Sequence, residues 1–131
     1  VCPAVIFVLE GAVRGVLAPN PVPQDYVHKI GAPLALRPQN FLNNVQDMNH
    51  LSEYLQSLSA RYDRISKPLL LIHGDRDELV PFWNPGRRLL PVVPDVTAVK
   101  LPDTGHAPHH SNPGAVIGAL SDFIDRIRPA P

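Results

Sequence analysis

Two aspartates and a histidine have the residue types and the placement for proton-transfer chemistry. Asp75 and Asp77 follow the apolar run Leu69–Ile72 in the stretch LLLIHGDRDELVP, and His106 stands in the later stretch LPDTGHAPHH. A carboxylate that accepts a hydrogen bond from an imidazole N–H fixes the ring tautomer. It also stabilises the imidazolium that forms when histidine acts as a general base. An aspartate paired with His106 is therefore a candidate acid–base device.

The elements that must position these side chains are two strands. The run Leu69–Ile72 is short, continuously apolar and bounded by proline and glycine, which is typical of a parallel strand covered on both faces. Val96–Leu101 carries β-branched residues and predicts the next strand. Neighbouring strands lie about 5 Å apart, and ligands bind beyond the carboxyl ends of parallel strands. We therefore expect the two aspartates and His106 to share one edge of a sheet.

A helix is predicted after each strand. Asn84-Pro85 places a capping residue before a proline and predicts a short helix through about Leu90. Asn112-Pro113 opens a last helix whose apolar residues lie on one stripe. Strand, helix, strand and helix with short connections predict an α/β fold, in which helices pack on a parallel sheet.

The first half of the chain predicts helices and a proline-broken loop. The N-terminal run VCPAVIFVLEGAVRGVLAP indicates a buried helix, since Glu10 and Arg14 interrupt it and no basic region or cleavage site frames a membrane span or a signal. The segment APNPVPQDY indicates a loop. From Pro38 to Ile65, apolar residues recur every three or four positions, so we expect one helix, or two in succession, that packs along one face. These apolar positions are Phe41, Val45, Met48, Leu51, Leu55, Leu58 and Tyr62.

Composition excludes several classes of protein. The chain has 131 residues, of which 44% are apolar, so it could bury one modest core and is one domain or part of one. Lys plus Arg and Asp plus Glu are both 12, so the chain offers no basic face for nucleic acid. Cys2 is the single cysteine and cannot form an internal disulfide, which favours a reducing compartment, the cytoplasm.

Two other interpretations of these polar residues stay open. An aspartate in GDRD can cap its own turn without any catalytic role, because Asp side chains often bind nearby backbone N–H groups. His106, His109 and His110, with Asp103 nearby, make a conceivable metal site, but their spacing matches no common zinc signature. We therefore predict no metal, and no motif implies an organic cofactor.

The two polar stretches together resemble a known family. PLLLIHGDRDELVP, LPDTGHAPHH and the terminal amphipathic helix are similar to the C-terminal part of the α/β-hydrolase fold, whose catalytic triad follows the order nucleophile, acid, histidine. The resemblance implies that Asp77, the second aspartate of a Gly-x-x-Asp turn, is the acid and that His106, after a glycine, is the catalytic histidine. Asp75 is the fallback acid.

The resemblance also implies a domain organisation. It covers Pro68 to about Ile127 well, so residues 66–131 are expected to be the last two strand–helix units of the hydrolase core. Residues 1–65 resemble the variable helical cap that many members insert before these strands. The rest of the core is expected N-terminal to Val1.

One part of the family's machinery is not in this sequence. The nucleophile elbow, Gly-x-Ser-x-Gly or a version with Asp, sits on a strained strand-to-helix turn. No such pentapeptide occurs here, and Cys2 also lacks the flanking glycines. The serines without those glycines are Ser52, Ser57, Ser59, Ser66, Ser111 and Ser121.

The resemblance implies an enzyme that hydrolyses an ester-type or related bond in a small, fairly apolar substrate. The chain would be part of a longer serine hydrolase of the esterase kind and would have little or no activity alone. Lactone, amide, epoxide and haloalkane substrates stay open, since the nucleophile lies outside this sequence. The alternatives are a non-catalytic truncated remnant or binding module of the same fold, and a split enzyme whose elbow is on another chain.

Overall fold

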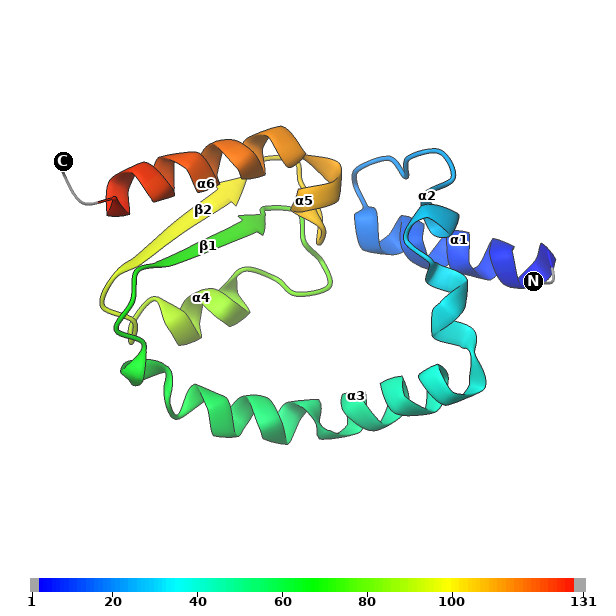
Figure 1. Cartoon of the computed structure of the whole chain (residues 1–131), viewed down its shortest axis with the longest axis horizontal. Coiled ribbons are helices and arrows are strands. Elements are labelled where there is room, and N and C mark those ends of the chain that lie inside the picture. Colours follow the sequence, from blue (N-terminus) through cyan, green and yellow to red (C-terminus); the bar gives the residue numbers. More distant parts are fainter. Residues whose placement is uncertain (1–2, 129–131) are drawn as a thin grey trace. The chain divides into compact units, whose positions relative to one another are not determined.

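The computed structural model describes residues 3–128, so the predictions that involve Val1 and Cys2 lie outside the described residues. Helices dominate the chain, and two short strands lie in its second half (Figure 1). In chain order the elements are α1 (Pro3–Leu17), α2 (Tyr26–Lys29), the 3-10 helix η1 (Ala32–Leu36), α3 (Pro38–Ser59), the 3-10 helix η2 (Tyr62–Arg64), β1 (Leu69–Gly74), α4 (Trp83–Leu89), β2 (Val96–Leu101), α5 (Pro108–Ser111) and α6 (Pro113–Ile127).

The described residues divide into two compact units. The first holds the residues up to Gly15 together with Val22–Ala60, and the second holds Val16–Pro21 together with the residues from Arg61 onward. Both strands and both polar loops therefore belong to the second unit, with a short segment from the end of α1. That residues 1–65 act as a cap stays a prediction.

A parallel pair of strands organises the second unit. Within the described residues β1 and β2 form a two-stranded parallel sheet, in which Leu69 lies opposite Val96 and Gly74 lies opposite Leu101. The predicted bounds of the second strand are confirmed. The first strand runs past the predicted end at Ile72, because the ladder continues with the N–H of Asp75 bonded to the carbonyl of Leu101 at 3.0 Å.

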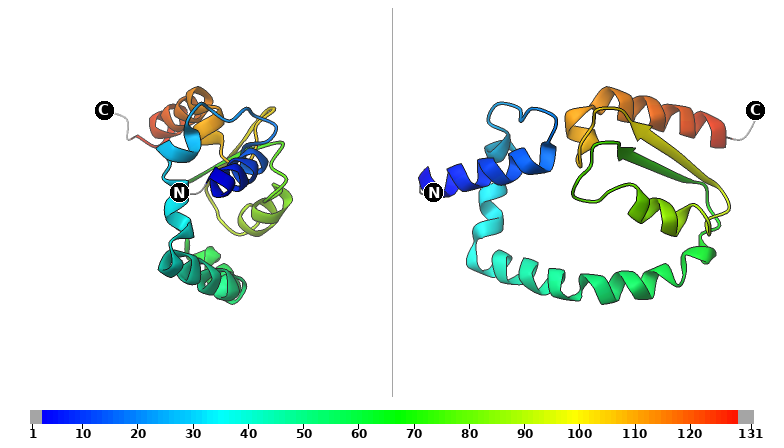
Figure 2. Two further views of the ribbon diagram at one scale, coloured as in Figure 1. Left: turned by 90° about the vertical axis from the view of Figure 1, so that its right-hand side faces the viewer. Right: turned by 180° about the vertical axis from the view of Figure 1, so that it is seen from behind.

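Helices α6 and α4 lie toward opposite faces of this sheet (Figures 1 and 2). Thr97 and Val99 of β2 line a groove against α6. Lys100, which points to the other face because successive strand residues alternate, holds its ammonium 4.0 Å from the ring centroid of Phe82, just before α4. The predicted α/β arrangement, with helices packed on a parallel sheet, is confirmed.

The predicted start of α4 at Asn84-Pro85 is wrong. The helix begins at Trp83, and its N-cap residue Phe82 has helical backbone angles, so Asn84 lies inside the first turn and caps nothing. Proline fits there because the first N–H groups of a helix have no intrahelical acceptor to lose. The last helix does begin at Pro113 as predicted, although Asn112 makes no side-chain capping bond.

Burial in the second unit is greatest near the carboxyl ends of the strands. His73, Asp77 and Thr104 are the buried polar side chains of the described chain. Leu101 and Ala107, which flank the histidine loop, are buried as well. The remaining buried apolar side chains are Leu17, Val27 and Val93. The polar loops are thus the best-packed part of this unit.

The predicted burial of the first-half helices is wrong, although their positions are confirmed. Phe7 of α1 is exposed, and so are the apolar residues along α3, where Met48 is 68% exposed. The reason is local: α3 contacts η1 near its start, where the Asn40 side chain donates to the carbonyl of Leu34, and no described element of its unit lies along the rest of the stripe. No helix of residues 3–128 combines the length and the apolar character needed to span a membrane.

These exposed surfaces predict self-association of the isolated 131-residue chain. Apolar area left in water costs about 25 cal/mol per Å², and the edge of β1 away from β2 has no pairing strand in the described chain. We expect species larger than a monomer in size-exclusion chromatography with light scattering. Phe41→Lys with Met48→Lys should shift the distribution toward monomer, whereas the matched change Gln46→Lys, also on exposed α3, should not. A monodisperse wild-type monomer would contradict the prediction.

Candidate active site

The backbones of the two polar loops lie directly against each other. The N–H of Arg76 donates to the carbonyl of Thr104 at 3.0 Å, just beyond the last paired residues of the strands. A Cβ on Gly74 would overlap the carbonyl oxygens of Thr104 and Gly105. Only glycine allows this approach, so the residue that ends β1 brings the acid loop and the histidine loop within hydrogen-bonding reach.

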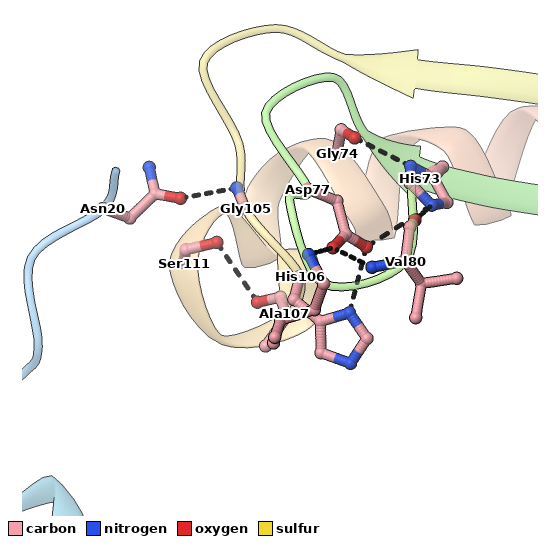
Figure 3. A network of polar contacts seen from close by, with 10 residues as sticks. Asn20, His73, Gly74, Asp77, Val80, Gly105, His106, Ala107 and Ser111 are labelled. Atoms are coloured by element: carbon pink, nitrogen blue, oxygen red, sulfur yellow. Dashed lines mark hydrogen bonds and ion pairs between the residues drawn. The ribbon is translucent and has the colours of Figure 1, made fainter. Parts of the chain in front are cut away.

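Asp77 is the centre of the polar network (Figure 3). Its Oδ1 accepts hydrogen bonds from the N–H groups of Leu79, at 3.0 Å, and Val80, at 2.9 Å. Its Oδ2 lies 2.9 Å from Nδ1 of His106. The carboxylate therefore caps its own turn and contacts the histidine, so the turn-capping interpretation and the pairing with His106 describe the same side chain.

The charge of Asp77 is stabilised where it lies. Burial raises the pKa of this carboxyl, but the hydrogen bonds from Val80 and His106, together with the positive charge that His106 and His73 can carry, outweigh burial and lower the pKa from its ordinary value. The group is thus a carboxylate at neutral pH, and a carboxylate only accepts hydrogen bonds. The N–H of His106 must then lie on Nδ1.

His106 presents its other nitrogen outward. The side chain of Asp77 is 4% exposed, whereas that of His106 is 39% exposed. Nε2 of His106 has no hydrogen-bond partner among the described residues. With the proton on Nδ1, Nε2 carries a free lone pair, so the ring is oriented as a general base with one face of the site open to a reactant.

A second histidine, His73, touches the acid loop and was missed by the sequence analysis. It is buried in β1, and its Nε2 lies 2.8 Å from the carbonyl oxygen of Val80 and 3.4 Å from Oδ2 of Asp77. Its Nδ1 lies 2.7 Å from the carbonyl oxygen of Gly74, and its ring packs edge-on against Phe82 with centroids 5.4 Å apart. His73 therefore ties the end of the strand to the loop that carries the acid. The only signal in the sequence is its place directly before the glycine.

Asp75 is not brought to the histidine. It is exposed, and its Oδ1 lies 3.4 Å from the N–H nitrogen of Thr104, a long contact that joins the two loops. No contact joins Asp75 to His106 in the described chain. The geometry thus separates the two aspartates of GDRD into a buried one that faces the imidazole and an exposed one that does not.

The conceivable metal site does not form. His109 and His110 lie in α5 with their ring centroids 4.2 Å apart. Asp103 points toward Arg76 at 3.5 Å in an exposed pair. Among residues 3–128 no three His, Cys, Asp or Glu side chains gather closely enough to hold a metal ion.

A residue from the N-terminal half also reaches the histidine loop. The side-chain amide of Asn20 donates from Nδ2 to the carbonyl of Asp103 at 2.9 Å. It accepts at Oδ1 from the N–H of Gly105, also at 2.9 Å (Figure 3). Asn20 belongs to the short segment that packs with the second unit. Nothing in the sequence pattern indicated this contact, which joins positions more than 80 residues apart.

The network predicts that Asp77 contributes to stability, and Asp75 much less. Asp77→Ala leaves two backbone N–H groups and the Nδ1–H of His106 without their acceptor, which should lower the free energy of unfolding by about 1–3 kcal/mol at pH 7. The matched change Asp75→Ala removes one long contact of an exposed side chain and should cost under about 0.5 kcal/mol. Urea unfolding followed by circular dichroism at one fixed protein concentration measures both.

The same pair of variants has a pH signature. Because the folded-state pKa of Asp77 is lowered, its ionisation stabilises the fold fully above the ordinary aspartate value of 3.8, and this contribution is lost as pH falls through the lowered pKa. The gap in stability between wild type and Asp77→Ala should therefore narrow as the pH falls from about 5 through the lowered pKa of Asp77. A gap that widened over this same acid range would contradict the ionised state of Asp77.

Comparison with known proteins agrees with this architecture. No family model matches the chain. Over 107 residues the chain is 33% identical to the protein named "Putative carbamate hydrolase RutD" from Pseudomonas syringae pv. syringae (strain B728a). The match takes in 78% of this chain and 41% of that protein, so the chain spans well under half the length of this curated relative.

Two solved structures share the fold at low sequence identity. A serine hydrolase involved in carbazole degradation, the CarC enzyme, superposes with a TM-score of 0.73 and 16% identity over 90% of this chain and 46% of its own. A membrane phospholipase A, described as a bacterial virulence factor, superposes with a TM-score of 0.66 and 19% identity over 93% of this chain and 38% of its own. With its parallel strands and covering helices, the chain has the α/β-hydrolase fold and carries the C-terminal part of that fold.

Proposed function

We propose that the chain is the acid-and-histidine part of a hydrolase, in which Asp77 orients His106 and His106 acts as the general base. The observation that carries this proposal is the contact of 2.9 Å between Oδ2 of Asp77 and Nδ1 of His106, made by a buried carboxylate to a ring whose Nε2 is open. The likeness to proteins named as hydrolases supports it.

In the proposed reaction, His106 takes up and returns each proton that is transferred. Nε2 of His106 takes the proton of a nucleophile hydroxyl as its oxygen attacks the substrate carbonyl, and Asp77 stabilises the imidazolium through Nδ1–H. The imidazolium gives that proton to the leaving group as its bond to the acyl carbon breaks. A water then loses a proton to Nε2 and attacks the acyl-enzyme, and the returned proton releases the free nucleophile.

The nucleophile must come from outside this sequence. The sequence contains no elbow pentapeptide, and the hydroxyl of Ser111, the serine that lies in the polar network, donates to the carbonyl of Ala107 at 3.1 Å. We propose that the elbow and the rest of the hydrolase core lie N-terminal to Val1, with a separate chain as the alternative source. The match to only 41% of the relative's length supports this proposal.

The same comparison supports a proposal for the substrate class. We propose an ester-type or related bond in a small, fairly apolar molecule, with carbamates included because the relative's name specifies a carbamate hydrolase. Esters and carbamates share a carbonyl that a hydroxyl nucleophile can attack, so one histidine with the described geometry serves both. No nucleic-acid or membrane partner is part of this proposal.

Two further parts of the proposal rest on the sequence. Residues 1–65 would form the cap over the substrate, since the helices of that region precede the acid strand. A single cysteine supports a reducing location, so we assign the enzyme to the cytoplasm.

A second candidate function is a non-catalytic remnant or binding module of the same fold. The observation that favours it is the missing elbow, because Asp77 and His106 cannot perform acyl transfer without a nucleophile. The two candidates differ in the DNA upstream of the codon for Val1. An open frame with Gly-x-Ser-x-Gly after a strand pattern supports the enzyme, an Asp in that place indicates dehalogenase or epoxide hydrolase chemistry, and a closed frame supports the remnant.

Substitutions in the protein that includes the elbow test the proposed roles. Asp77→Asn and His106→Ala should each lower kcat/KM for p-nitrophenyl acetate by about 10³-fold or more, as removal of a triad member does in other hydrolases. The matched control Asp75→Asn should change kcat/KM by less than about threefold, since its side chain does not contact His106. The 131-residue chain alone should neither turn over this ester with a burst nor be labelled by a fluorophosphonate probe. Unchanged turnover in Asp77→Asn and His106→Ala would refute the assignment.

A further inference from the structure

We infer that Asn20 is a positioning residue for His106, although the two lie 86 positions apart in the sequence. The effect on catalysis rests on the proposed function. The contacts of Asn20 with the loop do not depend on that proposal. Asn20 touches backbone atoms only, at the turn directly before His106, so it acts on the imidazole through the loop rather than on a reacting atom.

The Asn20 side-chain amide forms one hydrogen bond with each end of the turn formed by Asp103 and Gly105. Its NH₂ group faces the carbonyl of Asp103 and its oxygen faces the N–H of Gly105, each at 2.9 Å. A flipped amide would place oxygen against oxygen and N–H against N–H, so the pair of contacts fixes the orientation of the side chain. Few side chains can donate and accept at once across one short turn, and aspartate, which has nearly the same shape, can only accept.

The turn needs partners from elsewhere in the chain. β2 ends at Leu101, so the backbone groups of Asp103 and Gly105 have no ladder to join. Asp103 has a φ of 49°, in the left-handed region that is unfavourable for most residues other than glycine, asparagine and aspartate. Thr104 inside this turn is 1% exposed, and the contact between the Gly105 N–H and Asn20 is partly buried. Asn20 thus satisfies both ends of a partly buried turn.

The segment that carries Asn20 is itself held against the loop. Leu17 is 2% exposed, and its carbonyl accepts the N–H of Asn20 at 2.8 Å, which closes a turn. A Cβ on Gly105 would overlap the carbonyl oxygen of Ala18. The backbone of this segment therefore lies directly against Gly105, and the buried Leu17 anchors it there.

Gly105 precedes His106, so a displacement of this turn moves the imidazole away from Asp77. The contact between Nδ1 and Oδ2 is 2.9 Å long, and a shift of about 1 Å in a catalytic group can cost 10²-fold in rate. The amide of Asn20 thereby sets the distance on which the tautomer of His106 depends.

The test uses three variants of the 131-residue chain. Asn20→Ala removes both contacts, Asn20→Asp keeps an acceptor for Gly105 and loses the donor, and Asn40→Ala is the matched control. The control also deletes one side-chain bond to backbone, that of Asn40 to the carbonyl of Leu34 at 2.8 Å, but in the first unit.

Two NMR measurements at neutral pH report the role directly. In Asn20→Ala the exchange of the Gly105 amide with deuterium should become about tenfold faster or more, since the hydrogen bond that protects it is gone. The Nδ1–H resonance of His106 should broaden or vanish, and the ring nitrogens should shift toward a mixture of tautomers. Asn20→Asp should lie between wild type and Asn20→Ala, and Asn40→Ala should match wild type. Helix content by circular dichroism should stay at the wild-type level in all three.

The outcomes separate this inference from the proposed function. Gly105 exchange within twofold of wild type and an unchanged His106 signal in folded Asn20→Ala would overturn the inference. If Asn20→Ala does not fold, the His106 signal of Asn20→Asp decides, because Gly105 keeps its acceptor in that variant; an unchanged wild-type signal would again overturn the inference. Failure of the proposed function would give a different result. His106→Ala would then leave turnover unchanged in the protein with the elbow, while Asn20→Ala would still change the Gly105 amide exchange and the His106 tautomer.

Discussion

The buried carboxylate of Asp77 is the constraint on which the rest of the candidate site depends. An isolated charge in a site that is 4% exposed costs several kcal/mol, and this cost is offset only when donors surround it. Two backbone N–H groups satisfy one oxygen, and His106 contacts the other, with His73 close by. The backbone of the acid loop therefore takes the conformation that brings these N–H donors to the carboxylate. The orientation of the His106 ring is set by its contact with the same carboxylate. Every buried side-chain nitrogen and oxygen of the described residues has a hydrogen-bond partner.

The parallel strand pair makes this concentration of contacts possible. Strands in register end at the same level, so the loops that follow Gly74 and Leu101 begin side by side. Two glycines then let peptide groups touch where side chains would keep them apart: Gly74 against the histidine loop, and Gly105 against the carbonyl of Ala18. Backbone-to-backbone packing of this kind holds the carboxylate and the imidazole more rigidly than exposed side-chain contacts, which are worth little.

Much of the second unit could be predicted from the sequence, because its signals are local. The apolar run before His73 and the β-branched run Val96–Leu101 give the strands, the Asn-Pro pairs give the approximate helix starts, and parallel topology then brings Asp77 to His106. Burial of α3 could not be predicted, since apolar periodicity shows which face is apolar and not what covers it. The contacts of His73 and Asn20 were also out of reach, because they join side chains to particular backbone atoms and have no periodicity in the chain.

This chain contains both members of the pair Asp77 and His106, although it contains no nucleophile elbow. Its geometry depends on two adjacent strand ends, two glycines and the turn that Asn20 holds, all of which lie in the second unit. The tautomer of His106 is set by Asp77, so Nε2 is unprotonated and directed outward before any hydroxyl arrives. A nucleophile from another part of the fold would need only to place its oxygen within hydrogen-bonding distance of Nε2. The most demanding part of the arrangement, a buried charge matched to an oriented ring, is therefore formed by local contacts. In the proposed enzyme, the rest of the fold would contribute a well-placed hydroxyl and the donors for the oxyanion that it generates.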